Sequence, residues 1–205
     1  MDMKPRREFK ENSPAFSLIE LLLVVGILGV LYALAFSPSA ARYQRAKKQL
    51  CEANLEKIYV AMQLYANDFG SRTPTTTNAT TSEAALAILV PHYTVDTDVF
   101  ICPGGRDSDL ASGTSLKQGK ISYAYYMGRE LGSSAEGLLS DRQVNTNRKA
   151  VNDDLFSATG QAPGNNHRKY GGNVLFGDGH VEVSPAAAAF ALDYPTNVTL
   201  LNPKP

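Results

Sequence analysis

The side chains best suited to proton transfer or metal binding lie in the C-terminal half of this 205-residue chain. They are Asp141, His167, Asp178 and His180. Imidazole and carboxylate groups can hold zinc and other transition metals, or move protons in a hydrolytic reaction. Their spacing favours neither use, because the chain contains no H-E-x-x-H, C-x-x-C or G-x-S-x-G sequence. We therefore interpret the histidines as hydrogen-bonding residues of a loop and a strand, and expect no catalytic residue and no assigned metal ligand.

The composition of the chain gives no support to nucleic-acid binding or to a disulfide-rich scaffold. The chain has 20 basic and 20 acidic residues, so its formal charge is zero and no overall field would attract nucleic acid. Two cysteines are enough for one disulfide but too few for a disulfide scaffold. The length suits one domain of ordinary size and one appendage.

The appendage is predicted by an apolar segment near the N-terminus. Residues 16–36, FSLIELLLVVGILGVLYALAF, carry Glu20 as their only formal charge. As a helix they would be about 30 Å long, which matches the hydrocarbon core of a bilayer, so the segment is predicted to be a transmembrane helix. An ordinary anchor would not carry a carboxylate, because a central charge costs roughly 2.5 to 3.5 kcal/mol. The simpler interpretation places Glu20 near the interface, protonated or reaching water.

The residues around Glu20, S-P-A-F-S-L-I-E-L-L-L-V-V at 13–25, resemble the N-terminal signal of type IV pilins and type II secretion pseudopilins. The resemblance implies a leader peptide over 1–15, prepilin peptidase cleavage between Ala15 and Phe16, and N-methylation of Phe16. It also implies that Glu20, fifth in the mature chain, acts in assembly. Ala15 replaces the family's usual glycine, which predicts slower cleavage.

The same resemblance implies a structural function, as a subunit of a type II secretion pseudopilus or a type IV pilus-like filament. The implied partners are the prepilin peptidase and N-methyltransferase, copies of the chain and other pilins, and an inner-membrane assembly platform, with no nucleic acid. The implied localisation is the bacterial inner membrane, single-pass with an extracytoplasmic head, followed by a periplasmic pseudopilus or surface filament.

A different class of function stays open beside this one. The chain could be a membrane-anchored or secreted extracytoplasmic domain with an enzymatic or ligand-binding role. Ala33-Leu34-Ala35 is an acceptable cleavage site for an ordinary signal peptidase. Two features argue against an ordinary signal peptide: the apolar run is longer than the roughly 7 to 15 residues usual for the apolar region of a signal peptide, and it contains Glu20.

Helical periodicity resumes after Pro38, where a kink is expected. Residues 37–70 are predicted to be an amphipathic continuation of the first helix, giving one helix of about 50 residues that Gly70 ends. The predicted fold class is α+β, a long N-terminal helix, transmembrane in its first half, packed against a small antiparallel sheet in the pilin-like lollipop shape. The core-facing stripe is predicted from apolar residues at steps of three and four: Cys51, Leu55, Ile58, Met62, Tyr65 and Phe69.

Residues 71–205 are predicted to form a loop-rich α/β head. A short helix is expected from Ser82, as its N-cap, to Val90. Strands are expected at short runs of β-branched and aromatic residues: 99–102, 121–126, 137–142, 173–176 and 180–183. The turn at 177–179 predicts a C-terminal β-hairpin of type I′. Residues 104–120 and 185–205 are interpreted as loop and tail.

Further segments carry the resemblance into the head: C-x-x-N-L at 51–55, Y-A-N-D at 65–68, F-I-C-P at 100–103, and N-H at 166–167 followed by N-V-L-F-G-D-G-H-V at 173–181. They resemble a prepilin subfamily with a C-terminal His followed by Asp-Gly, similar to the major pseudopilin of type II secretion. Because major pseudopilins as a class bind calcium, a structural calcium ion is the one cofactor suggested. Its ligands stay unassigned among the acidic residues of the head: Asp96, Asp98, Asp107, Asp109, Asp153, Asp154 and Asp178.

The two cysteines are predicted to pair. Export would place both in an oxidising compartment, where paired thiols tend to close. Cys51 lies on the core-facing stripe and Cys102 ends a strand candidate, so a helix-to-sheet disulfide is plausible on geometry. The alternative is two buried free thiols.

Overall fold

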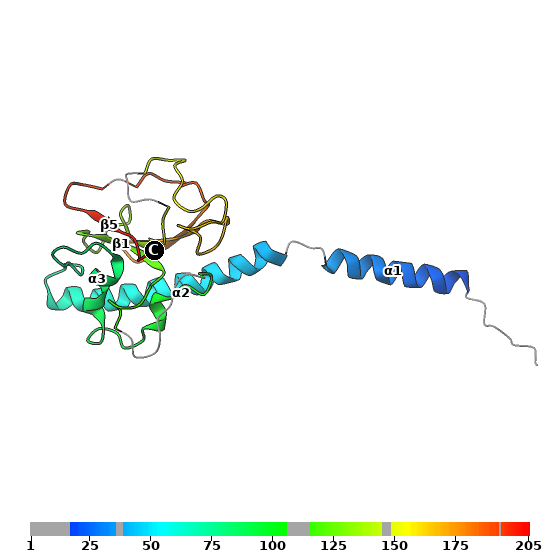
Figure 1. The fold of residues 1–205 in the computed structure, drawn as a ribbon, viewed down its shortest axis with the longest axis horizontal. Coiled ribbons are helices and arrows are strands. Elements are labelled where there is room, and N and C mark those ends of the chain that lie inside the picture. The colour runs from blue at the N-terminus through cyan, green and yellow to red at the C-terminus, as the bar shows by residue number, and fades with distance from the viewer. Residues whose placement is uncertain (1–16, 36–38, 106–114, 145–148, 193) are drawn as a thin grey trace, which may run out of the picture. The chain divides into compact units, whose positions relative to one another are not determined.

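The structure is a computed structural model that describes residues 17–35, 39–105, 115–144, 149–192 and 194–205 (Figure 1). The chain divides into two compact units, Met1–Ser39 and Ala40–Pro205. The predicted cleavage and methylation residues, Ala15 and Phe16, lie outside the described residues.

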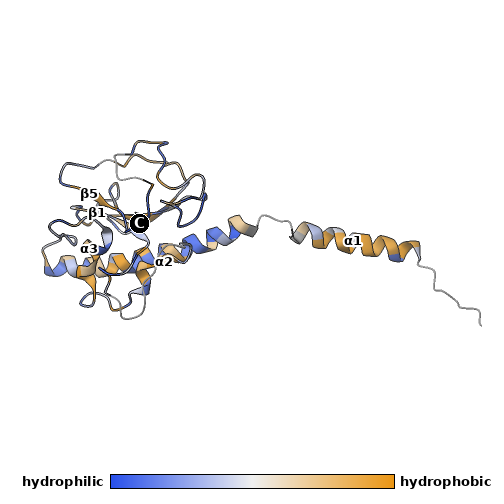
Figure 2. Ribbon diagram, viewed as in Figure 1, coloured by the Kyte–Doolittle hydropathy of each residue, from blue (hydrophilic) through white to orange (hydrophobic). Residues whose placement is uncertain are grey.

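Helix α1, Leu18–Ala35, is the described helix of the first unit. Figure 2 shows that it is mostly hydrophobic. In the part of the chain that the structure describes, no helix combines the length and the apolar character needed to cross a membrane. The predicted transmembrane helix over 16–36 was therefore wrong, and so was the single-pass inner-membrane localisation. The described helix α1 has 18 residues, fewer than the 21 of the predicted segment.

Helix α2, Ser39–Asp68, begins after residues 36–38, so the predicted single helix of about 50 residues is two helices of 18 and 30 residues. The predicted fold class, built on one long helix with a transmembrane first half, was wrong. A physical reason lies in Pro38, which has no N–H to donate to a continuous helix and disfavours helical geometry in the residue before it.

The buried face of α2 follows the predicted stripe through Tyr65. The buried side chains are Cys51, Leu55, Ile58, Met62 and Tyr65, whereas Phe69 lies beyond the helix end with 52% of its surface exposed. Gly70 follows with a φ of 64°, the left-handed conformation that commonly ends a helix. Towards the N-terminus the same face becomes polar, with Gln44 and Lys48 buried.

The second unit contains a five-stranded antiparallel sheet in the order β4-β3-β2-β1-β5. Its strands are β1 Tyr123–Met127, β2 Gly137–Asp141, β3 Gly172–Phe176, β4 Val181–Ser184 and β5 Thr199–Leu201. Strand β5 was not predicted, because the tail was interpreted as irregular. It pairs with β1, Tyr125 lying opposite Leu201.

Alternate residues of the sheet enter two different hydrophobic clusters. Tyr123 and Tyr125 of β1 belong to the cluster that contains the α2 stripe, whereas Ala124 and Tyr126 belong to a second cluster with residues of 155–200. Successive strand residues point to opposite faces, so both faces of the sheet are covered. Full burial of a large apolar side chain stabilises the fold by about 1.5 to 3 kcal/mol, which makes these two clusters the main stabilising contribution.

Short helices replace two predicted elements of the head. The helix near Ser82 is α3, Ser82–Leu86, continued by the 3₁₀ turn η1, Ala87–Leu89, and its N-cap is Thr81 rather than Ser82. The predicted strand at 99–102 overlaps a 3₁₀ turn, η2, Asp98–Phe100. The β3–β4 turn is not type I′, because Gly179 has a positive φ of 97° and Asp178 does not.

Candidate functional site

A buried polar cluster joins α2 to the sheet and its loops. Cys51 comes from α2, Cys102 from the segment after η2, Asp141 from the end of β2, and His167 from the loop before β3. One ligand-type atom from each lies within 4.8 Å of the others, and all four residues are at most 1% exposed. Long-range folding therefore creates this cluster, which we call the Cys–His–Asp cluster.

Cys51 and Cys102 form a disulfide across 51 positions of sequence, as predicted. The Cys102 N–H donates to Ser122 Oγ at 2.7 Å, and the Gly104 N–H donates to Cys102 Sγ at 3.4 Å. Asn54, one helical turn after Cys51, donates from Nδ2 to the Ile101 carbonyl at 3.0 Å. These bonds hold the Cys102 segment against α2.

Asp141 is a fully buried carboxylate whose oxygens both accept hydrogen bonds. Oδ1 accepts from Asn166 Nδ2 at 2.8 Å, and Oδ2 accepts from the Asn173 backbone N–H at 2.8 Å. Oδ2 also lies 3.3 Å from His167 Nε2. Asn166 Nδ2 donates in addition to the Ser122 carbonyl at 2.8 Å. A buried charge needs such partners, because an unsatisfied carboxylate would be strongly destabilising.

His167 connects the carboxylate to the disulfide. Its Nε2 lies 3.3 Å from Asp141 Oδ2 and 3.4 Å from Cys102 Sγ, whereas its Nδ1 has no hydrogen-bond partner among the described residues. Gly104 packs directly on the ring, since a Cβ there would lie 2.6 Å from Nδ1. Only glycine fits at this close approach.

The pKa values of two further ionisable side chains are shifted by burial near the cluster. Burial lowers the pKa of Lys48, and the nearby Asp141 carboxylate opposes that shift. Burial also raises the pKa of Tyr123 well above its usual range, and the Asp141 charge adds to the increase. Lys48 is bound to the site through its backbone, because Asn173 Nδ2 donates to the Lys48 carbonyl at 3.0 Å. The cluster thus combines a carboxylate with a buried cationic side chain.

The other predicted pair of chemical residues lies elsewhere. Asp178 and His180 are on the exposed β3–β4 turn, where His180 Nδ1 lies 2.5 Å from Asp178 Oδ1 and the ring stacks on Phe176. The bonds from His180 lower the pKa of Asp178. The four residues considered at the start therefore form two separate pairs.

The acidic residues considered for calcium do not gather into one site in the described ranges. Asp107 and Asp109 lie outside these ranges. Asp96 accepts the Asp98 N–H and Asp153 accepts the Ala150 N–H, both in local turns.

Glu20 lies in the first turn of α1, where sequence reasoning missed a local role. Its Oε2 accepts the Ser17 N–H at 3.4 Å. Ser17-x-x-Glu20 is the capping-box pattern, in which a Glu or Gln in the first turn satisfies the N–H of the residue before the helix. The signal was readable in the sequence. A local cap thus competes with an assembly role for this carboxylate.

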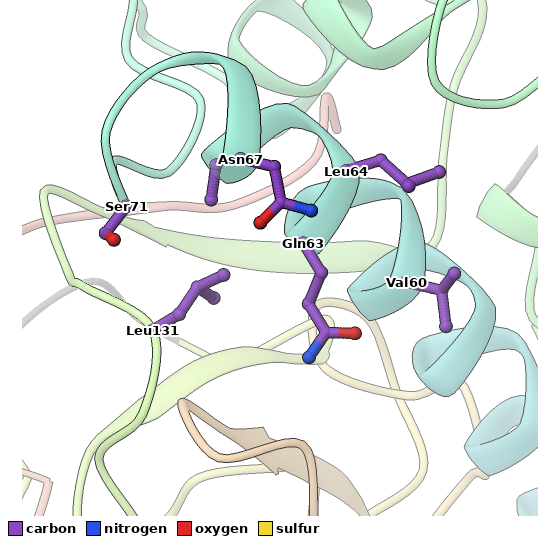
Figure 3. Close-up of a pocket in the computed structure, with 7 residues that line it drawn as sticks. Val60, Gln63, Leu64, Asn67, Ser71 and Leu131 are labelled. Atoms are coloured by element: carbon purple, nitrogen blue, oxygen red, sulfur yellow. The ribbon is translucent and has the colours of Figure 1, made fainter.

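One surface pocket lies beside α2, and its volume of about 390 Å³ is large enough for a small ligand (Figure 3). Its lining consists of apolar and uncharged polar side chains: Val60, Gln63, Leu64, Ala66, Asn67, Ser71 and Leu131. Because none of these ionises in the ordinary pH range, the pocket offers no acid, base or nucleophile of the usual kinds.

Asn166, Asn173 and Lys48 are the site residues that sequence reasoning did not single out. The two asparagines stood within segments noted for their resemblance to prepilins, as did Cys51, Cys102 and His167. These segments lie far apart in sequence and meet at the Cys–His–Asp cluster. Comparisons with family models, curated proteins and solved structures found no match for the chain.

The geometry suits a structural role for the cluster better than catalysis. Catalysis on an external substrate requires that the reacting groups meet substrate and water, and these four residues are at most 1% exposed. The disulfide, the contact between His167 and Asp141, and the asparagine bonds instead tie α2, β2 and β3 together.

Proposed function

We propose that this chain is a structural subunit of a pilus-like or pseudopilus-like filament. The observation that carries the proposal is α1, an apolar helix that begins within the prepilin-like signal and whose large apolar side chains are exposed. Leu18, Leu22 and Leu28 expose 76%, 63% and 57% of their surfaces. A helix that is apolar all round needs apolar neighbours on several sides. The α1 helices of further copies supply them.

Burial of α1 among copies gives Glu20 a role between subunits. After cleavage behind Ala15, Phe16 would carry an ammonium that stays cationic when methylated. An unpaired carboxylate in an apolar bundle is strongly destabilising, and a neighbouring ammonium offsets much of that cost. The pair would also fix the stagger of neighbouring helices, because one stagger brings the two charges to the same level.

The local cap provides a sharp test of this role. Glu20→Gln removes the charge but keeps an acceptor that can cap the helix, since Gln replaces Glu in capping boxes. Ser17→Ala weakens the cap and keeps the charge. We expect Glu20→Gln to reduce the yield of filaments sheared from cells at least about tenfold, which corresponds to loss of a buried ion pair worth about 1.4 kcal/mol or more. Ser17→Ala should assemble like the native chain.

The opposite pattern would contradict the proposal. If Ser17→Ala blocks assembly and Glu20→Gln does not, Glu20 acts as a helix cap. If both variants are processed and neither changes filament yield, the carboxylate has no part in assembly.

A further inference from the structure

The Cys–His–Asp cluster contains the donor set of a structural zinc site. Zinc in proteins is bound by cysteine sulfur, histidine nitrogen and carboxylate oxygen, usually four ligands in a tetrahedron. Cys51, Cys102, His167 and Asp141 provide two sulfurs, one nitrogen and one oxygen within 4.8 Å of one another. In the disulfide form the sulfurs are bonded to each other and hold no metal.

We propose that reduction of the Cys51–Cys102 disulfide converts this cluster into a closed zinc site made by Cys51, Cys102, Asp141 and His167. The same point of the fold is then held by a covalent bond in oxidising conditions and by a divalent metal ion in reducing conditions. This role is independent of filament assembly and requires no residue of α1.

Two of the distances between ligand atoms already suit a zinc site. His167 Nε2 lies 3.4 Å from Cys102 Sγ and 3.3 Å from Asp141 Oδ2. In a tetrahedron with zinc–sulfur bonds of about 2.3 Å and zinc–nitrogen or zinc–oxygen bonds of about 2.0 to 2.2 Å, ligands are about 3.3 to 3.8 Å apart. The two sulfurs must separate, which reduction permits.

Hydrogen bonds around the cluster already orient the ligands. Asn166 Nδ2 donates to Asp141 Oδ1 at 2.8 Å, and the Asn173 N–H donates to Asp141 Oδ2 at 2.8 Å. Such outer partners hold ligands in place and strengthen metal binding. Gly104 presses on the His167 ring and limits its rotation.

Charge balance also favours a divalent ion. In the disulfide form the cluster contains the Asp141 carboxylate, whose charge acts favourably on the buried Lys48 side chain. In the zinc form two thiolates add two negative charges and Zn²⁺ adds two positive ones. The net charge of the buried cluster is unchanged, so metal binding introduces no uncompensated charge.

The conversion balances with a dithiol as the reductant. The dithiol gives two electrons and two protons to the disulfide and becomes a disulfide itself, leaving two cysteine thiols. Zn²⁺ displaces one proton from each thiol to solvent as the two zinc–sulfur bonds form. His167 binds through Nε2, so the neutral ring carries its proton on Nδ1. A proton held on Nε2 in the disulfide form is released to solvent as an equal one is taken up at Nδ1.

The test uses the full chain, reduced anaerobically by a dithiol that is then removed, with Co²⁺ as a spectroscopic substitute for zinc. The reduced chain should bind one Co²⁺, with the visible bands of a tetrahedral site and a thiolate-to-cobalt charge-transfer band, and zinc should displace it. The disulfide form is the matched control and should show neither band. Zinc should also raise the thermal midpoint of the reduced chain and leave that of the disulfide form unchanged.

Variants assign the ligands. His167→Gln should weaken zinc binding at least about tenfold. His180→Ala removes an exposed histidine near Asp178 and Glu182 and should leave binding unchanged. The proposal is overturned if the reduced chain keeps its far-ultraviolet circular dichroism but binds no metal, or if the bands depend on His180. It is equally overturned if the reduced chain unfolds and metal does not restore its fold.

Discussion

Removal of the Cys51–Cys102 disulfide is expected to lower the free energy of unfolding of the second unit. The bond closes a loop across 51 positions of sequence. The chain-entropy relation for a loop of this length gives about 14 cal/mol/K, or about 4 kcal/mol at 25 °C, of lost stability when the cross-link is absent. In a unit of this size each kcal/mol corresponds to about 2 to 4 °C, so the thermal midpoint should fall by about 8 to 16 °C.

Two perturbations separate the cross-link from the packing of the sulfurs. Cys51→Ala with Cys102→Ala removes the bond and the sulfur volume, whereas reduction of the native chain removes the bond alone. In urea unfolding with a metal chelator present, the double variant and the reduced chain should both be less stable than the native chain. Their free energy of unfolding should also fall more steeply with urea concentration, because the unfolded chain expands without the cross-link. A midpoint unchanged on reduction would refute the entropic argument. Free thiols in the denatured, unreduced chain would refute the disulfide.

Three further predictions concern other positions. Burial raises the pKa of Tyr125 and Tyr126, so the unfolded chain loses these phenol protons at a lower pH than the folded chain does. The free energy of unfolding should therefore fall as the pH rises above about 10, which urea unfolding followed together with phenolate absorbance would measure. Gly104→Ala should destabilise the chain by about 1 to 3 kcal/mol because its Cβ would meet His167, and an unchanged urea midpoint would contradict this contact. Ala15→Leu should accumulate as uncut precursor on an immunoblot while Ala15→Gly is cut at least as well as the native chain, and normal processing of the Leu variant would disprove the cleavage site.

Local patterns predicted the parts of the fold that local physics decides. The steps of three and four from Cys51 to Tyr65 gave the buried face of α2, because a helix that packs on a core must keep one apolar stripe. The positive φ of Gly70 was likewise predictable from its place after the stripe. The prediction that Phe69 belongs to the buried stripe was wrong, because the helix ends at Asp68 before this residue can reach the core.

Features that depend on pairing between strands far apart in the sequence could not be predicted from local patterns. Strand β5 has three residues and owes its existence to its partner β1, so no pattern of its own revealed it. The contact between Asp141 and His167 depends on the pairing of β2 with β3, which places Asn173 and the preceding loop beside the end of β2. The predicted transmembrane helix over 16–36 and its continuation past the expected kink at Pro38 rested on hydropathy and periodicity, which do not fix where each helix begins and ends.

The covalent state of the N-terminus tests the proposed function most directly. Intact-mass and peptide mass spectrometry of the chain from its producing cells measure where it begins and whether that residue is methylated. The filament proposal predicts a chain that starts at Phe16 with one N-methyl group. A chain that starts at Phe36, after Ala33-Leu34-Ala35, or one that keeps Met1, would contradict it.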